Sequence, residues 1–174
     1  MKNLKLSEAN LSFKVLISLF LLAVAVGYVF GLIHIYTDVG FSYTGVVTHY
    51  RGEGGKPALP PELAFSKLIH LHHVHLFSLS MLFILIGTIF TMTELPEIPK
   101  AIFVSMPFIG MFFDFTSFWL LAFASPIFGF FAMIFGGLMA FSFFLIIGRP
   151  LYEMWVLPIW RKQWGETNVP WFLR

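Results

Sequence analysis

Residues 13–35 read FKVLISLFLLAVAVGYVFGLIHI, and this stretch decides the fold class. Its only strongly polar side chains are Lys14 near the start and His34 near the end. About 20 apolar residues are enough to cross a hydrocarbon core ~30 Å thick as a helix. A helix satisfies every backbone hydrogen bond internally, which the lipid interior requires. The stretch therefore predicts a transmembrane helix.

Three further stretches have the same character, at residues 68–93, 101–124 and 127–148, and the first helix is expected over about 13–36. The chain of 174 residues is 58% hydrophobic and only 11% charged. Its mean hydropathy is +0.84. Such a composition indicates an integral membrane protein. We expect an all-α fold in which residues 1–174 form one membrane domain, a bundle of four transmembrane helices.

Lysine and arginine predict the orientation of the bundle. With the N-terminus inside, eight of them are cytoplasmic: Lys2, Lys5, Lys14, Lys100, Arg149, Arg161, Lys162 and Arg174. Three are outside: Arg51, Lys56 and Lys67. The positive-inside rule then favours N-in and C-in, in a bacterial inner membrane. Residues 37–66 become an outer loop, and the tail 149–174, with its tryptophans, an anchor at the cytoplasmic headgroups. The sequence Pro60-Pro61-Glu62 predicts that the second helix begins before the membrane.

Composition also excludes several kinds of chemistry. The chain has no cysteine, which excludes disulfides, thiolate-ligated iron–sulfur clusters and covalent haem attachment through cysteine. A formal net charge of +2 is too small to suggest nucleic acid as a partner. No glycine-rich phosphate loop or zinc-protease motif is present.

The histidines carry the best chemical signal. Residues 70–77 read HLHHVHLF and hold four of the six histidines in the chain. His34 lies about 20 residues from the cytoplasmic boundary of the first helix, and the His73–His75 pair lies equally far along the second. Consecutive antiparallel helices are usually neighbours. We therefore expect imidazoles from two helices at one level near the outer surface.

Helical periodicity sorts these residues by face. His72 and His75 share one face of the second helix, and His70 and His73 share another. On the first helix, Gly27, Gly31 and His34 form one stripe. The glycines either let helices pack closely or leave room for a flat macrocycle beside a ligating histidine.

A b-type haem needs an axial imidazole, often two from opposing helices, and an apolar slot. His34 and His75 are the preferred axial ligands, with His73 as the alternate on the second helix. Arg51 lies on the same side and is a candidate partner for a propionate. His70 and His72 are candidate propionate partners or ligands of a second metal site. All of these histidines can equally be solvated groups near the headgroups, where polar residues cost little.

Asp114, in the third helix, is a second candidate. It lies about 20 Å along that helix from the cytoplasmic edge, at 1.5 Å per residue, and so in the outer half of the membrane. A lone carboxylate at that depth should face inward and pair with a polar group. It is a candidate proton acceptor beside a quinol, a partner of a haem histidine or a metal ligand. Its alternative role is a structural hydrogen bond to a nearby hydroxyl.

With these residues, the chain loosely resembles the small four-helix b-type cytochrome subunits of bacterial respiratory complexes. The resemblance implies an electron-transfer subunit of a complex with other membrane subunits. It would pass electrons between quinol and an outer c-type cytochrome or iron–sulfur partner. It would not be catalytic by itself. One departure is that the third and fourth helices contain no histidine. Two alternatives remain. One is a copper or iron oxidase or hydroxylase subunit that uses His34, His72, His75 and Asp114; the other is a scaffolding subunit without a cofactor.

Overall fold

A computed structural model describes residues 5–53 and 57–164. Four long helices dominate it: α1 (Leu11–Asp38), α3 (Pro61–Thr91), α4 (Glu97–Phe123) and α5 (Phe128–Leu151). A short helix α2 (Tyr43–Arg51) lies between α1 and α3 in the sequence, and a 3-10 turn η1 (Leu6–Glu8) precedes α1. Helix α5 continues through a π-helical segment η2 (Tyr152–Val156) into α6 (Leu157–Trp164). The helices α1, α3, α4 and the continuous stretch Phe128–Gln163 are each long and apolar enough to cross a membrane.

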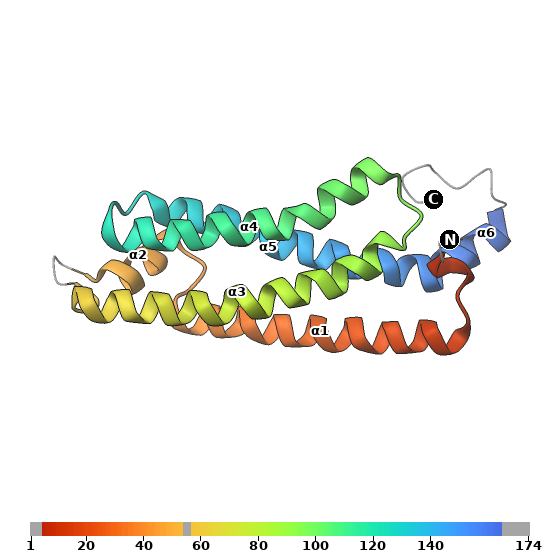
Figure 1. The fold of residues 1–174 in the computed structure, drawn as a ribbon, viewed down its shortest axis with the longest axis horizontal. Coiled ribbons are helices and arrows are strands. Elements are labelled where there is room, and N and C mark those ends of the chain that lie inside the picture. The colour runs from red at the N-terminus through yellow and green to blue at the C-terminus, as the bar shows by residue number, and fades with distance from the viewer. Residues whose placement is uncertain (1–4, 54–56, 165–174) are drawn as a thin grey trace.

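The four helices run alternately up and down (Figure 1). The bundle has a hairpin end, where α2 lies beside the turn between α4 and α5, and a terminal end, where η1, α6 and the α3–α4 connection gather (Figure 1). The segments at the two ends of the described chain therefore share one side. This arrangement is what an N-in and C-in topology requires, although it does not decide which side is cytoplasmic.

The tightest seam of the bundle runs between α4 and α5. A Cβ atom added at Gly110 would lie 3.0 Å from the Phe135 carbonyl oxygen and 3.1 Å from Met139 Cβ, so the two backbones are close there. Further along, the Phe113 and Phe135 rings stack at 4.9 Å. The buried stripe of α4 comprises Pro107, Gly110, Met111, Asp114, Ser117 and Leu121. Helical spacing of these residues explains why one face of α4 is covered from Pro107 to Leu121.

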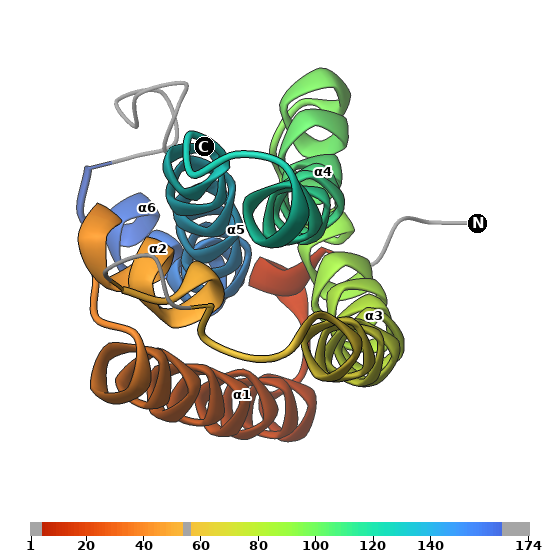
Figure 2. The same ribbon diagram turned by 90° about the vertical axis from the view of Figure 1, so that its left-hand side faces the viewer.

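Helix α1 is held much more loosely. Leu21 is its one buried residue, although apolar side chains surround the whole helix. It is tied to the rest of the bundle by the Tyr28 ring, which stacks on Phe143 at 3.9 Å, and by Trp155, whose indole N–H donates to Ser18 Oγ at 2.8 Å. Figure 2 shows α1 along the rim of the bundle. Most of its apolar surface is therefore available to lipid or to other subunits.

The four predicted spanning helices are present, and the structure adds helix at two places outside them. The second spanning helix begins at Pro61, as Pro60-Pro61-Glu62 predicts. The expected outer loop contains α2, whose N-cap Ser42 accepts a hydrogen bond from the Gly45 amide. The fourth helix extends past residue 148, so that the expected interfacial tail is helical as far as Trp164. Trp171, the last tryptophan of that tail, lies outside the described residues.

Candidate functional site

His72 lies in a cage of aromatic rings at the hairpin end. Its imidazole packs against three residues of α4, with ring-centroid distances of 4.5 Å to Phe115, 5.7 Å to Trp119 and 6.5 Å to Phe118. Both of its ring nitrogens are buried and have no hydrogen-bond partner among the described residues. A buried imidazole with two unmet nitrogens is costly, and this points to a missing partner.

His75 lies one turn further along α3 and is exposed. Its Nδ1 is 2.9 Å from the carbonyl oxygen of Leu71, in the preceding turn. Because a carbonyl only accepts hydrogen bonds, Nδ1 carries the proton there and donates it. In the neutral ring, Nε2 then holds the free lone pair. A backbone carbonyl on one ring nitrogen is the usual support of a histidine that ligates a metal through the other.

His34 does not meet His75 across the helices. Its side chain is 74% exposed, and its Nδ1 lies 3.6 Å from Asp38 Oδ2, on its own helix. No hydrogen bond or ring contact joins the two imidazoles among the described residues. The physical reason is the loose packing of α1, which leaves this end of the helix uncovered. We expected His34 and His75 to lie at one level. Among the described residues of the chain by itself, no hydrogen bond, ion pair or ring contact joins them.

Gly27 and Gly31 of the same stripe are not close-contact glycines. A Cβ atom added at either position would meet no atom within 4 Å. The packing interpretation of this stripe is therefore wrong for the chain by itself. Open space beside the helix remains, as the macrocycle interpretation requires.

The other predicted cofactor residues are His70, His73 and Arg51. His70 and His73 are exposed on α3, and the His73 ring contacts Phe77 at 5.2 Å. Arg51, at the end of α2, donates from Nη1 to the carbonyl oxygen of Leu121 at 2.8 Å. One of its five donors is therefore used to satisfy the C-terminal end of α4, and the others remain for an anionic partner.

Helix α2 closes the hairpin end over the aromatic cage. Tyr50 contacts Phe118 at 4.7 Å, and His49 contacts Tyr50 at 4.9 Å. Burial lowers the pKa of His49, and the nearby charge of Lys67 lowers it further. Burial, with a contribution from the charge of Asp114, raises the pKa of Tyr50 to about 12. Both side chains are therefore neutral at physiological pH.

Asp114 faces inward, as its depth predicts, and is only 6% exposed. It packs against α5 at Gly136, where an added Cβ would lie 3.5 Å from Asp114 Oδ1. Four hydroxyls were candidate partners from the sequence: Thr116, Ser78, Ser80 and Tyr28. Two of them donate elsewhere, Thr116 to the Phe112 carbonyl and Ser78 to the Val74 carbonyl. Within residues 5–53 and 57–164, no side-chain hydrogen bond to this carboxyl is formed. A bound water or ligand would have to supply one, since a buried polar group without a partner is expensive.

The space at the hairpin end bears on which cofactor fits. The pocket bordered by His49, Tyr50, Lys67 and Leu71 has a volume of only about 20 Å³. Small-molecule sites are typically ~300–1,000 Å³. This pocket is therefore too small to hold a macrocycle. No group of three or more His, Asp or Glu in the described part of the chain is placed to hold one metal ion.

Comparison with known proteins places the chain in a family. A model of a family described as a transmembrane helical domain matches residues 40–161, more than two thirds of the chain. The chain belongs to this family. No curated protein and no solved structure matches it.

The family match covers some of the candidate site residues and not others. The transmembrane helical domain begins after α1 and ends within α6, so it contains His72, His75 and Asp114. His34 and its glycine stripe precede it. The family match supports a multi-pass membrane protein, and its description mentions no cofactor.

One functional feature was missed at the sequence level. From the sequence, the aromatic residues of α4 could line a quinone site or serve as plain packing, and their contact with His72 was not predicted; in the structure three of them pack against its imidazole. The available signal was the spacing of Phe115, Phe118 and Trp119, which are i, i+3 and i+4 on one helical face. What the spacing does not reveal is which neighbouring helix that face meets.

Proposed function

We propose that this chain is a haem b-binding subunit of a larger electron-transfer complex in the membrane, with His75 as an axial ligand. The observation that carries the proposal is the hydrogen bond from His75 Nδ1 to the Leu71 carbonyl, at 2.9 Å. It holds the ring in one tautomer and directs the Nε2 lone pair away from the α3 backbone. This is the arrangement a metal-ligating imidazole needs.

The exposure of His75 determines where the cofactor would lie. With no large cavity at the hairpin end, the macrocycle would rest on the outer face of α3, against lipid or another subunit. A second axial imidazole would come from that subunit, or from His34 if α1 shifts toward α3. A b-type haem supplies single-electron exchange when it is bound. The role of the chain would be to orient the iron ligand and to keep the site near the outer surface.

Quinol is the small molecule that would fit this role. Oxidation of a quinol releases protons together with electrons, so a proton acceptor must be close by. Asp114 is buried, has no hydrogen bond to its carboxyl within the described part of the chain, and is the candidate acceptor. The outer c-type cytochrome or iron–sulfur partner would take the electron. The chain alone would not be the enzyme but one subunit of an oxidoreductase.

The test is a reduced-minus-oxidised optical spectrum of the full chain, purified from haem-supplied membranes. We expect a sharp α-band and one haem per chain by pyridine haemochrome extraction. His75→Ala should remove most of this band, because iron loses its ligand. His49→Ala is the control, since His49 is a histidine of α2 that is not among the candidate ligands, and it should retain the band.

Each other outcome supports a different function. A band that survives His75→Ala overturns the ligand assignment. Stoichiometric copper or iron without an α-band indicates the oxidase or hydroxylase alternative. Neither haem nor metal, in membranes where other haem proteins are loaded, leaves the scaffolding role.

A further inference from the structure

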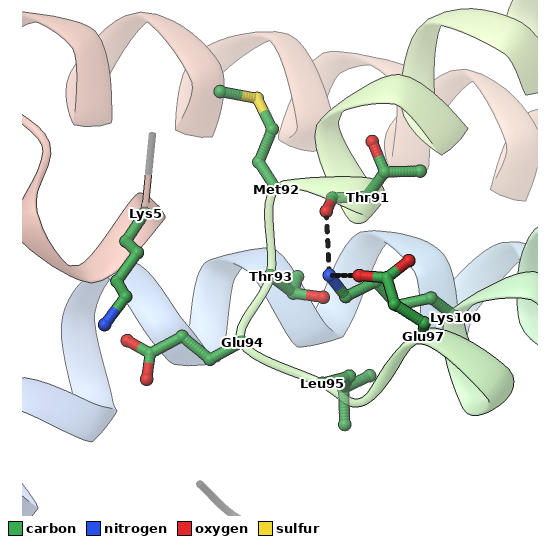
Figure 3. A pocket seen from close by; sticks show the side chains of 8 residues that line it. All are labelled: Lys5, Thr91, Met92, Thr93, Glu94, Leu95, Glu97 and Lys100. Atoms are coloured by element: carbon green, nitrogen blue, oxygen red, sulfur yellow. Dashed lines mark hydrogen bonds and ion pairs between the residues drawn. The ribbon is translucent and has the colours of Figure 1, made fainter. Parts of the chain in front are cut away.

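A second site lies at the opposite end of the bundle from the histidines. A pocket of about 550 Å³ opens there between η1 and the connection from α3 to α4. Lys5, Thr93, Glu94, Glu97 and Lys100 supply its polar lining (Figure 3). Helix α3 ends and α4 begins beside the pocket, so we expect it to lie near the boundary between lipid headgroups and water.

Lys100 is held in the pocket wall. Its side chain is only 12% exposed, and its Nζ donates to the Thr91 carbonyl at 3.2 Å and to Glu97 Oε1 at 2.9 Å (Figure 3). Glu97 is 88% exposed. An ion pair with so exposed a partner is weak and exchanges readily. Lys100 is therefore a fixed cation whose present partner can be replaced by a bound anion.

Thr93 supplies a hydrogen bond donor without a partner. The residue is only 4% exposed, and its hydroxyl has no partner among the described residues. An unpaired buried hydroxyl costs about 1–3 kcal/mol. A ligand in the pocket that accepts this hydrogen bond would recover that cost.

The start of α4 adds a further preference for negative charge. The helix begins at Glu97, after Pro96, and no side chain caps it. In this first turn Pro99 has no amide proton and the Lys100 amide donates to the Pro96 carbonyl at 3.2 Å, which leaves the amides of Glu97 and Ile98. These two amides and the positive end of the helix dipole favour anions.

Glu94 does not oppose an anion, because its charge is already matched. Arg161 donates to both of its carboxylate oxygens, at 3.1 and 2.6 Å. These hydrogen bonds are the main reason why the pKa of Glu94 is lowered. The carboxylate is thus directed toward α6. Lys5 lies 3.7 Å from the exposed Glu8 carboxylate and Lys100 is paired with the exposed Glu97, so a bound anion would replace two exposed partners.

We propose that this pocket binds a phosphate group, held by Lys100 and the Thr93 hydroxyl, with Lys5 at its entrance. The group would belong to a phospholipid headgroup or to a soluble phosphate ester. Both have the same anionic oxygens, which accept hydrogen bonds from an ammonium and a hydroxyl. The proposal is independent of the haem assignment, because the two sites lie at opposite ends of the bundle.

The experiment measures thermal unfolding of the full chain in a neutral maltoside detergent. Three additives are titrated: a short-chain phosphatidylglycerol, glycerol 3-phosphate, and the matching diacylglycerol without phosphate. The variants are Thr93→Val and Lys100→Gln. Lys162→Gln is the control, because Lys162 is an exposed lysine on α6 that does not line the pocket.

We expect a phosphate-bearing additive to raise the unfolding temperature and diacylglycerol to leave it unchanged. Thr93→Val and Lys100→Gln should each weaken this effect by about tenfold in apparent affinity, the loss of one good hydrogen bond. A response to phosphatidylglycerol alone identifies a lipid headgroup, and an equal response to glycerol 3-phosphate identifies a soluble ester.

Thr93→Val also separates binding from folding. Without ligand, this variant should be at least as stable as the parent, since it removes an unpaired buried hydroxyl. If both pocket variants respond like Lys162→Gln, or if diacylglycerol acts as strongly as the phospholipid, the phosphate site does not exist.

Discussion

At the scale of single residues, buried carboxylates at the terminal end are paired with arginines and hydrogen-bond donors. Glu153 is completely buried, yet it accepts from Arg149 Nε at 2.7 Å and from the Glu94 amide at 2.8 Å. The Glu94 carboxylate in turn holds Arg161 and accepts from the Ser7 hydroxyl. These contacts join η1, the α3–α4 connection and α6. Hydrogen-bonded pairing is what makes buried carboxylates tolerable.

The pairing of Glu94 with Arg161 leads to a pH dependence of stability. The folded-state pKa of Glu94 lies below its unfolded value, chiefly because of the hydrogen bonds from Arg161. The stabilisation is therefore present above the unfolded pKa, about 4.3, and is lost as pH falls through the lower folded pKa. We expect Glu94→Gln to cost about 1–3 kcal/mol at pH 7 and less at pH 3.

The measurement is the thermal unfolding temperature in detergent at several pH values between 3 and 7. Glu97→Gln is the control, because its ion pair with Lys100 is exposed on the Glu97 side. It should change stability by much less than Glu94→Gln. Parallel pH curves for the parent and Glu94→Gln would show that this ion pair does not stabilise the fold.

At the scale of elements, the seam between α4 and α5 organises the bundle. Gly110 permits the close approach of the two backbones, and Asp114 and Ser117 follow it on the same face. Small residues allow such contacts between membrane helices. The sequence predicted the two helices but not this seam, because a glycine in an apolar helix has the same sequence signal whether or not a neighbour approaches it.

The seam can be tested with a matched pair of glycines. Gly110→Ala would place a methyl group about 3 Å from the α5 backbone and should destabilise the fold by roughly 1–3 kcal/mol through overpacking. Gly137→Ala, on α5, meets no atom within 4 Å and should be neutral or slightly stabilising, since alanine favours helix. Unfolding in detergent measures both. Equal stability of the two variants would contradict the close approach.

The last helix illustrates how a local residue reshapes an element. In η2, the Leu157 amide bonds to the Tyr152 carbonyl, five residues back, rather than to the residue four back. Pro158 follows directly and has no amide proton, so the regular helical hydrogen bond to Met154 cannot form. Glu153 lies inside this π segment, facing the α3–α4 connection. The π segment and the contacts of Glu153 together join α6 to the terminal end of the bundle.

At the scale of the whole molecule, α1 is distinct from the rest. It precedes the matched family region and fully buries one residue, while a few apolar side chains along one side pack partly against the core and the others are exposed. The helices α3, α4 and α5 form the tighter part of the bundle. Lipid or neighbouring subunits would cover α1 in the membrane, which agrees with the proposed role as one subunit of a complex.

The arrangement of the ends gives a test of topology. Both η1 and α6 lie at the terminal end, so reporters fused to the N- and C-termini should reside in the same compartment (Figure 1). The distribution of lysine and arginine predicts that this compartment is the cytoplasm. Alkaline-phosphatase and green-fluorescent-protein fusions report the two sides. Opposite sides for the two ends would contradict the four-span bundle.

The sequence by itself determined the class of the protein and the number of its spans, because crossing a bilayer demands long apolar helices whatever their neighbours are. It also determined that Asp114 faces inward, since the cost of exposing a carboxylate to lipid is local. Only the tertiary structure decided which histidine enters an aromatic cage, that His34 stays on the surface, and that a polar pocket forms from η1 and the α3–α4 connection. These features depend on how helices rotate and approach one another, and apolar patterns on lipid-facing helices carry little information about rotation.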